Sequence, residues 1–170
     1  MTDCFDGNRY KAAANNSGKA GEQAAECIAG MLRPMGYSVS RQYSVCNIRA
    51  DLFIRGVKEY PRGLIISIKT QFSKGTAEQK LTQEVTNLHK TGYPSIVLLI
   101  GNGWTKSLVD SIDADRAWHH KNVKAIFRSL DDFLQWSKDL PQIASNGHEL
   151  AGFDDSVQMS LFTLPIDTVT

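Results

Sequence analysis

The sequence predicts an α/β fold in which one domain has a mixed central sheet flanked by helices. Two kinds of hydrophobic pattern predict it, because some segments repeat apolar residues at helical spacing and others alternate or run continuously over strand lengths. Their order along the chain is helix, three strands, helix, strand, helix, strand, helix. This order is typical of a sheet that carries helices on its faces.

Four helices are expected from the helical spacing. In the first, Ala24, Ile28 and Leu32 share one face, and Pro34 ends the segment. In the last, Ser129 is a good N-cap residue. The four predicted ranges are 19–33, 76–90, 104–113 and 129–140.

Five strands are expected between these helices, at 37–43, 50–54, 64–70, 95–100 and 123–127. The first alternates apolar and polar residues, whereas 95–100 is almost continuously apolar, as in a strand buried on both faces. The connection between the second and third strands is short and rich in turn residues. It predicts that these two strands are adjacent and antiparallel.

Length and composition are those of one ordinary globular domain, with 170 residues of which 42% are hydrophobic. The longest apolar run, 96–100, is too short to cross a bilayer, so no membrane partner is expected. The N-terminus has no basic segment followed by an apolar stretch. Three cysteines cannot all pair within one chain. We therefore expect a reducing, cytoplasmic location.

Charge is distributed unevenly along the chain. Residues 33–90 contain ten basic and four acidic residues, a net charge of +6, whereas residues 141–170 contain four acids and no Lys or Arg. A basic body of this kind suits contact with a phosphate backbone. We expect a flexible polar arm at 1–17, a folded domain at 18–141 and a polar, acidic tail at 142–170.

Asp51 and Lys69 form the candidate chemical centre. In the third strand, Ser67, Lys69 and Gln71 share one face, and a lysine inside an apolar strand is costly unless it is paired or functional. If the second and third strands are neighbours, Asp51 and Lys69 can face one site. A carboxylate there can bind a divalent cation, and an ammonium can stabilise charge on a phosphate.

At this point the sequence resembles the PD-(D/E)XK nuclease superfamily, in a Ser-x-Lys variant, over roughly residues 18–140. The resemblance rests on four short motifs, which are Gly21-Glu22, Asp51, Ser67-Ile68-Lys69 and Gln71. The segment 74–81 adds to it. It implies a restriction-endonuclease-like fold and a metal-dependent endonuclease that hydrolyses phosphodiester bonds in double-stranded DNA. The implied cofactor is Mg²⁺, for which Mn²⁺ can substitute.

Ser67 departs from the family pattern, which has Asp or Glu two residues before the lysine. Serine is a poor Mg²⁺ ligand, so a second carboxylate must come from elsewhere. The candidates are Glu84, Glu78 and Glu22, of which Glu84 is preferred and Glu22 is expected as an outer ligand of the metal or its water. The expected catalytic residues are thus Asp51, Lys69, Gln71 and Glu84; the metal ligands are Asp51, Glu84 and Glu22; the residues expected to bind DNA are Arg41, Arg49 and Lys74.

Structural alternatives exist for each of these features. Lys69 could belong to an ion pair without catalytic function, and Glu78 could be a solvated helix residue. His119 and His120 are expected on the surface rather than as metal ligands, because adjacent residues point apart. Trp118 and Trp136 are expected in the core or in an interface.

The tail contains a second motif, Gln158-Met159-Ser160-Leu161-Phe162. It resembles the pentapeptide by which bacterial DNA enzymes bind the replicative sliding clamp. Leu161 and Phe162 would be adjacent apolar anchors, and Gln158 would supply an orienting amide. The alternative is that these two side chains pack on the chain's own core.

The sequence therefore predicts a Mg²⁺-dependent DNA endonuclease, either of restriction type or from a mobile element or phage. One small domain holds one site and a duplex has two strands, so a homodimer or higher oligomer is expected. Two alternatives stay open. One is a repair or junction-resolving nuclease, and the other is a catalytically silent DNA-binding subunit, which the serine at 67 favours.

Overall fold

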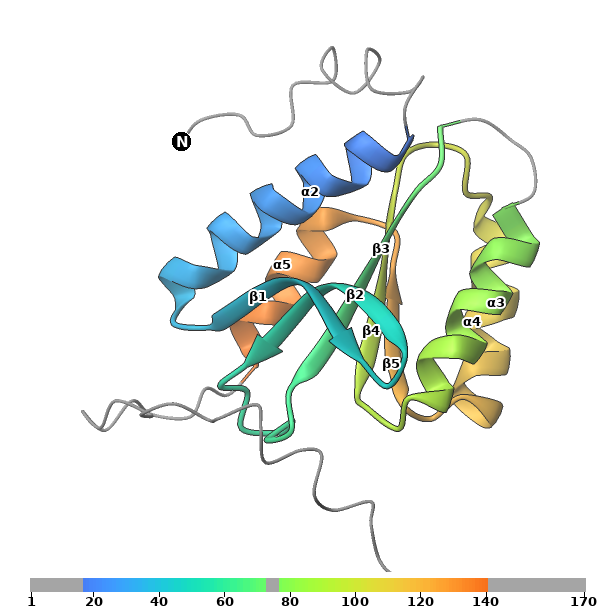
Figure 1. Ribbon diagram of the computed structural model, residues 1–170. Helices are drawn as coiled ribbons and strands as arrows, with labels where there is room; N and C mark the ends of the chain where they lie inside the picture. Colours follow the sequence, from blue (N-terminus) through green and yellow to red (C-terminus); the bar gives the residue numbers. More distant parts are fainter. Residues whose placement is uncertain (1–16, 73–76, 141–170) are drawn as a thin grey trace, which may run out of the picture.

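The computed structural model describes residues 17–72 and 77–140. They form a five-stranded sheet with helices on both faces (Figure 1). The strands are β1 (Ser38–Val45), β2 (Ile48–Arg55), β3 (Leu64–Thr70), β4 (Ser95–Ile100) and β5 (Val123–Phe127). The helices are α2 (Ser17–Leu32), α3 (Ala77–Lys90), α4 (Lys106–His119) and α5 (Leu130–Asp139), with a 3₁₀ turn η1 (Arg33–Met35) after α2.

The sheet is mixed, and its spatial order β1-β2-β3-β4-β5 follows the chain. The first two pairs of strands are antiparallel, and β3–β4 and β4–β5 are parallel. The α/β fold class and the antiparallel neighbours β2 and β3 are therefore confirmed. β1 and β2 are joined by Cys46 and Asn47, both at positive φ, as a two-residue hairpin turn requires.

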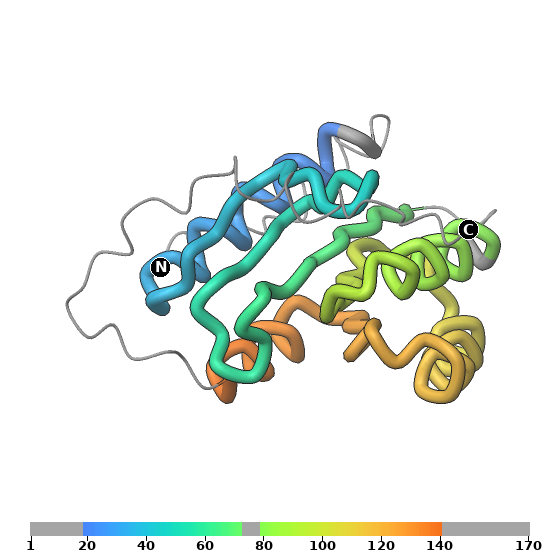
Figure 2. Tube along the Cα trace, turned by 60° about the horizontal axis from the view of Figure 1, so that its bottom comes forward, coloured from blue at the N-terminus to red at the C-terminus, as the bar shows by residue number. Residues whose placement is uncertain are grey.

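The helices cover the sheet in two pairs (Figures 1 and 2). α2 and α5 pack on one face, and α3 and α4 lie side by side on the other. The second pair shares a face because each helix connects two parallel strands, and such crossovers are almost always right-handed. The uncovered part of the second face belongs to β1 and β2, where most β1 residues are partly or fully exposed.

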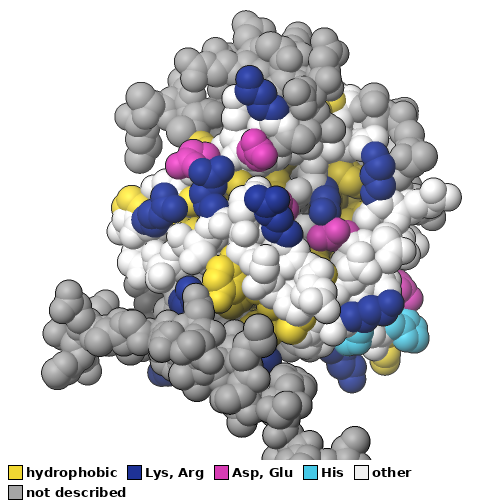
Figure 3. Space-filling model, viewed as in Figure 1, with side chains coloured by type: hydrophobic (Ala, Val, Ile, Leu, Met, Phe, Trp, Pro, Cys, Tyr) yellow, Lys and Arg dark blue, Asp and Glu magenta, His cyan; other side chains and the backbone are white. Residues whose placement is uncertain are grey.

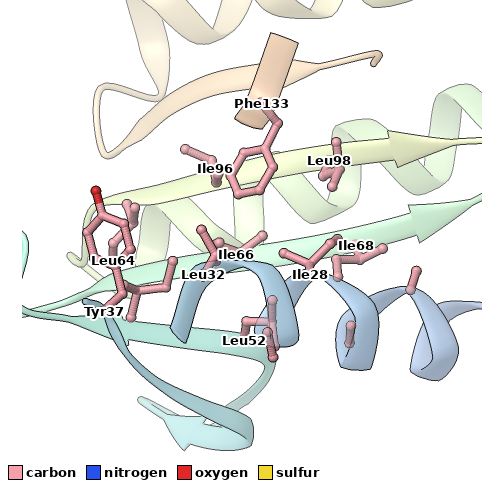
Figure 4. Packing of buried hydrophobic residues seen from close by; sticks show 14 of the residues in the cluster. Ile28, Leu32, Tyr37, Leu52, Leu64, Ile66, Ile68, Ile96, Leu98 and Phe133 are labelled. Carbon is pink, nitrogen blue, oxygen red and sulfur yellow. The ribbon is translucent and has the colours of Figure 1, made fainter. Parts of the chain in front are cut away.

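The core between α2, α5 and the sheet is built from aliphatic side chains (Figure 4). Ile28 and Leu32 of α2 are fully buried and pack toward Ile66 of β3, as their helical spacing predicts. Phe133 of α5 is also fully buried, over Ile96 of β4. The core fixes α2 across β3, so the N-terminal end of α2 lies at the end of the sheet where β3 finishes (Figure 1).

Two sequence predictions about this part of the chain are corrected. The helix expected at 104–113 runs from Lys106 to His119, because nothing after residue 113 breaks it. Trp118, on the extension, is 79% exposed, so the core interpretation is wrong for this residue. Trp136 does pack against the core, beside Phe127 and Phe133. Ser129 caps α5 as predicted, accepting hydrogen bonds from the backbone N–H groups of residues 131 and 132.

Candidate active site

β2 and β3 separate at Asp51, and this separation creates the site. Their paired residues end at Leu52 and Ile66. Beyond that point the Oδ2 atom of Asp51 accepts a hydrogen bond of 2.7 Å from the backbone N–H of Ile68. The carboxylate thus takes the place of a strand carbonyl, so the N–H of Ile68 stays satisfied while the strands diverge.

Glu84 of α3 connects the other predicted groups. Its Oε1 atom accepts a hydrogen bond of 2.6 Å from the hydroxyl of Ser67, and its Oε2 atom lies 2.9 Å from the Nζ atom of Lys69. Ser67 is buried, and the side chains of Lys69 and Glu84 are 32% and 21% exposed. A carboxylate from the helix therefore stands directly beside Ser67, next to the lysine.

A pocket of about 290 Å³ opens at this end of the sheet. Asp51, Lys69, Gln71 and Glu22 all contribute to its walls, so four of the predicted site residues face one space. Glu84 does not line this pocket and reaches the site through its contacts with Ser67 and Lys69. The complete lining is Gly21, Glu22, Gln42, Asp51, Ile68, Lys69, Thr70, Gln71, Lys80 and Trp104. Asp51 and Lys69 do not lie on opposite faces, an arrangement that would have excluded a joint role.

The Asp51 carboxyl is the perturbed ionisable group of the site. Its burial raises its pKa above the ordinary value of 3.8, and the negative charge of Glu84 adds to the increase. The hydrogen bond from Ile68 and the charge of Lys69 act in the opposite direction but do not cancel the burial. Two carboxylates therefore lie near one lysine, in surroundings that favour an additional positive charge.

The donor set fits a Mg²⁺ ion that is completed by substrate. Within 17–72 and 77–140, no group of three His, Cys, Asp or Glu residues lies close enough to hold a metal ion. Mg²⁺, however, is commonly held by one or two carboxylates, with substrate phosphates and waters supplying the remaining ligands. Glu84 forms an ion pair with Lys69, and Asp51 lies near enough for the charges of both to act on it. Glu22 lies in the pocket wall.

The residues expected to bind DNA lie outside the pocket or outside the described residues. Arg41 forms an ion pair with Glu26 of α2. Arg49 is exposed on β2, and its charge acts on Asp51. Lys74 lies outside the described residues, as do the arm, the tail and the motif residues Gln158, Leu161 and Phe162; the side chain of Glu78 is likewise not described.

Four residues of the pocket are neither predicted site residues nor part of the four short motifs, namely Gln42, Lys80, Trp104 and Thr70, the last residue of β3. Lys80 lies in the first turn of α3, Trp104 follows a glycine-rich turn, and Gln42 lies in the middle of β1. Trp104 is nearly buried, with its Nε1–H donating to the carbonyl of Ile100 over 3.2 Å. Lys80 could have been suspected from its place in the segment 74–81, which resembles restriction endonucleases. For Gln42 the sequence held no such signal.

Gly101, directly after β4, packs closely against the backbone of Gln71, directly after β3. It has φ of +100°, and a Cβ atom there would lie 2.2 Å from the carbonyl oxygen of Gln71. That oxygen also accepts a hydrogen bond from the N–H of Gly103. From the sequence, residues 101–103 are predicted only to form a turn. In the structure this turn also fixes the position of the Gln71 backbone.

The histidine predictions are partly wrong. His119 is exposed as expected, but the side chain of His120 is only 18% exposed. Its ring contacts that of His89 edge to face, with centroids 5.2 Å apart. His89 and His120 are distant in the sequence but pack against each other. Neither of them lines the pocket described above.

The surface around the site is predominantly basic. On the face shown in Figure 3, Lys and Arg side chains form a band across the middle of the view. On the β1–β2 hairpin, Arg41, Arg49 and Arg55 accompany Asp51 as the only acid. None of the helices in 17–72 and 77–140 combines the length and apolar character that crossing a bilayer would require.

Comparison with known proteins identifies one family. A family model described as PD-(D/E)XK nuclease superfamily domain matches residues 14–140, which include every element of the fold described above. No curated protein matches the chain significantly, and neither does any solved structure.

Proposed function

Because the chain belongs to the PD-(D/E)XK nuclease superfamily, whose members are generally nuclease hydrolases that use divalent metals, we propose that it is a Mg²⁺-dependent endonuclease that cuts double-stranded DNA. In this proposal Asp51, Glu84 and Lys69 are the catalytic residues. Gln71 assists them from the pocket that Asp51 and Lys69 also line, and Glu22 binds a water molecule of the metal.

The observation that carries the proposal is the position of the Glu84 carboxylate. The family's second acid is replaced by Ser67, which alone would suggest an inactive site. Glu84 bonds to the Ser67 hydroxyl and to the Lys69 ammonium at the same time. A carboxylate is thus available beside the position from which the family pattern would project one, and this supports an active enzyme over a silent DNA-binding subunit.

The residues divide the work of hydrolysis by charge. Water forms a new bond to phosphorus, one P–O bond of the DNA backbone breaks, and the departing oxygen takes a proton. Lys69 holds the attacking water and stabilises the negative charge that develops on the phosphate oxygens. Asp51 and Glu84 would hold the metal, which when bound polarises the phosphate and lowers the pKa of bound water.

The basic surface supports a polyanionic substrate. Arg41 and Arg49 lie on the hairpin beside the pocket, and we propose that they and Lys74 neutralise phosphates of the duplex. A homodimer would present two sites for two strands. The restriction, mobile-element or phage setting, and binding of a bacterial sliding clamp through Gln158, Leu161 and Phe162, belong to the same proposal.

A test needs purified protein, plasmid DNA and Mg²⁺. Cleavage is expected with wild type and is expected to be lost in EDTA, in Asp51→Ala and in Lys69→Ala, while Ser67→Ala retains most of it. Lys58→Ala is the matched control for the loss of a lysine, because Lys58 is exposed in the loop after β2 and does not line the pocket. DNA binding without cleavage by wild type would instead favour the DNA-binding subunit. Cleavage of branched DNA in preference to plasmid would favour a repair or junction-resolving enzyme.

A further inference from the structure

Gln42 has an unusual backbone conformation for a residue inside a strand. Its φ is +52°, in the left-handed region. The pairs on either side of it, Arg41–Leu52 and Tyr43–Ala50, belong to the regular β1–β2 register, and the pair that would join Gln42 to Asp51 is missing from that register. The distortion of β1 therefore lies directly across from the central carboxylate of the site.

The distortion reverses the side-chain alternation of β1. Phe53 is paired with Ser40, so in a regular strand it would share a face with Ser40 and not with Tyr43, three residues further on. The rings of Tyr43 and Phe53 are nevertheless stacked, with centroids 4.8 Å apart. In β2, Ala50 and Phe53 are also three residues apart and also belong to one core cluster. Both strands therefore change face at the level of Gln42 and Asp51, and both of these residues line the pocket.

This conformation is costly for glutamine. A residue with a Cβ atom is disfavoured in the left-handed region, and glutamine lacks the short side chain with which Asn and Asp compensate locally. The side-chain amide of Gln42 makes no hydrogen bond to any residue of 17–72 or 77–140. Within the described residues, the amide therefore makes no hydrogen bond that offsets the strain. The stacking of Tyr43 on Phe53 offsets part of the strain, but the amide of Gln42 does not. Backbone strain of this kind is concentrated at functional sites.

We propose that Gln42 is a substrate-binding residue, whose side-chain N–H donates a hydrogen bond to a phosphate oxygen of the DNA backbone. The inference rests on the proposed nuclease function and adds a residue to it. Lys69 and Lys80 line the same pocket and can pair with a phosphate group, whereas its two carboxylates, Asp51 and Glu22, are residues proposed above to bind the metal or its water. Contacts to phosphates fix the register of DNA on a protein without reading its sequence.

The variant Gln42→Gly distinguishes the effect of backbone strain on stability from the effect of the amide on DNA cleavage. Gln42→Gly removes the amide and also relieves the left-handed strain, since glycine adopts positive φ without cost. We expect the melting temperature to rise by about 2–4 °C, while kcat/KM for DNA cleavage falls about tenfold, mostly through KM. Gln42→Asn tolerates the backbone and keeps a shorter amide, so its kcat/KM is expected between the two.

Cys46→Gly is the matched control. Cys46 lies at φ of +44° in the turn of the same hairpin, is exposed, and does not line the pocket. This variant relieves a similar strain, so the melting temperature is expected to rise while kcat/KM stays within twofold of wild type. If both variants melt at a higher temperature but only Gln42→Gly loses kcat/KM, the loss of activity is due to the missing amide.

The contrary outcomes are specific. A Gln42→Gly protein with raised stability and wild-type kcat/KM would overturn the proposal, as would a loss confined to particular base sequences, which would indicate base reading. If wild type does not cleave DNA at all, the proposed function fails. Binding of a fluorescent duplex by wild type and Gln42→Gly still tests the contact in that case: about tenfold weaker binding supports it, and equal binding refutes it.

Discussion

Moving the second carboxylate from α3 to β3 would test the assignment of Glu84 directly. Glu84→Ala removes it, and Ser67→Asp/Glu84→Ala returns one at the position where the family pattern has it. The Ser67 hydroxyl lies 2.6 Å from the Glu84 carboxylate. A carboxylate that starts from residue 67 therefore enters the volume that Glu84 leaves, on the same strand face as Lys69.

The effect on stability is expected to be modest. Glu84→Ala loses one hydrogen bond to a charged group and one ion pair whose partners are 32% and 21% exposed. Solvent screens a pair with that exposure, so the total loss is about 1–2 kcal/mol. This corresponds to a decrease of about 2–8 °C in melting temperature, which leaves the protein folded at 25 °C.

The effect on activity is expected to be much larger. Removing a group that stabilises charge in the transition state commonly lowers the rate about 10²–10³-fold. We expect that loss for Glu84→Ala and a recovery of at least about tenfold in the double variant. The assay is Mg²⁺-dependent plasmid cleavage, with circular dichroism to verify folding, and Glu59→Ala is the control for the loss of an exposed glutamate away from the pocket.

A second comparison checks the geometry itself. Ser67→Asp alone would bring two carboxylates into contact, so it is expected to destabilise the protein more than the double variant does. The reasoning would be refuted if Glu84→Ala cleaved DNA within about threefold of wild type. The second carboxylate would then have to come from Glu78 or Glu22.

Three further predictions concern the metal site, the pocket turn and the tail. Burial raises the pKa of Asp51 above 3.8, so its ionisation costs stability as pH rises from 3.8 through the raised value. Asp51→Asn should therefore melt higher than wild type at pH 7 but not at pH 3. Mg²⁺ is expected to raise the melting temperature of wild type and not that of Asp51→Asn. Gly101→Ala should destabilise the protein by about 2 kcal/mol or more, because its Cβ atom would lie 2.2 Å from a backbone oxygen. Gly92 has φ of +70° but open space around it, so Gly92→Ala should cost about 1 kcal/mol. Denaturant titration measures both changes. Leu161→Ala/Phe162→Ala should keep the melting temperature and plasmid cleavage but lose binding to a purified bacterial sliding clamp in isothermal titration; a large fall in melting temperature would mean that these side chains belong to the protein's own core.

Local sequence patterns were sufficient for most elements of the fold. The bounds of β3, β4 and β5 match the predicted ranges. For β3 and β4 the reason is that burial on both faces leaves few polar positions to obscure the apolar run. Helix ends were less predictable. α4 continues to His119 because its weakly patterned second half contains no proline or glycine to stop it.

The sequence alone also determined the main candidates of the site, because each breaks a local pattern. Lys69 is a charged residue in an apolar strand, and Asp51 is the only acid of its hairpin. Tertiary structure was needed for what lies next to them. Only the packing of α3 against β3 brings the Glu84 carboxylate to Ser67 and Lys69, whereas the spacing of Glu84, Glu78 and Glu22 along the chain leaves all three open.

Tertiary structure likewise decided where two tryptophans and one glutamine lie. Trp118 and Trp104 have similar side chains, yet one is 79% exposed and the other is 8% exposed in the wall of the pocket. Gln42 alternates normally in the sequence, but its backbone is left-handed. These positions depend on contacts between residues distant in the chain, such as Tyr43 on Phe53. Local propensity and periodicity contain no information on such contacts. The sequence by itself therefore determined the helices, the strands and the distribution of charge, whereas tertiary packing determined which side chains come into contact.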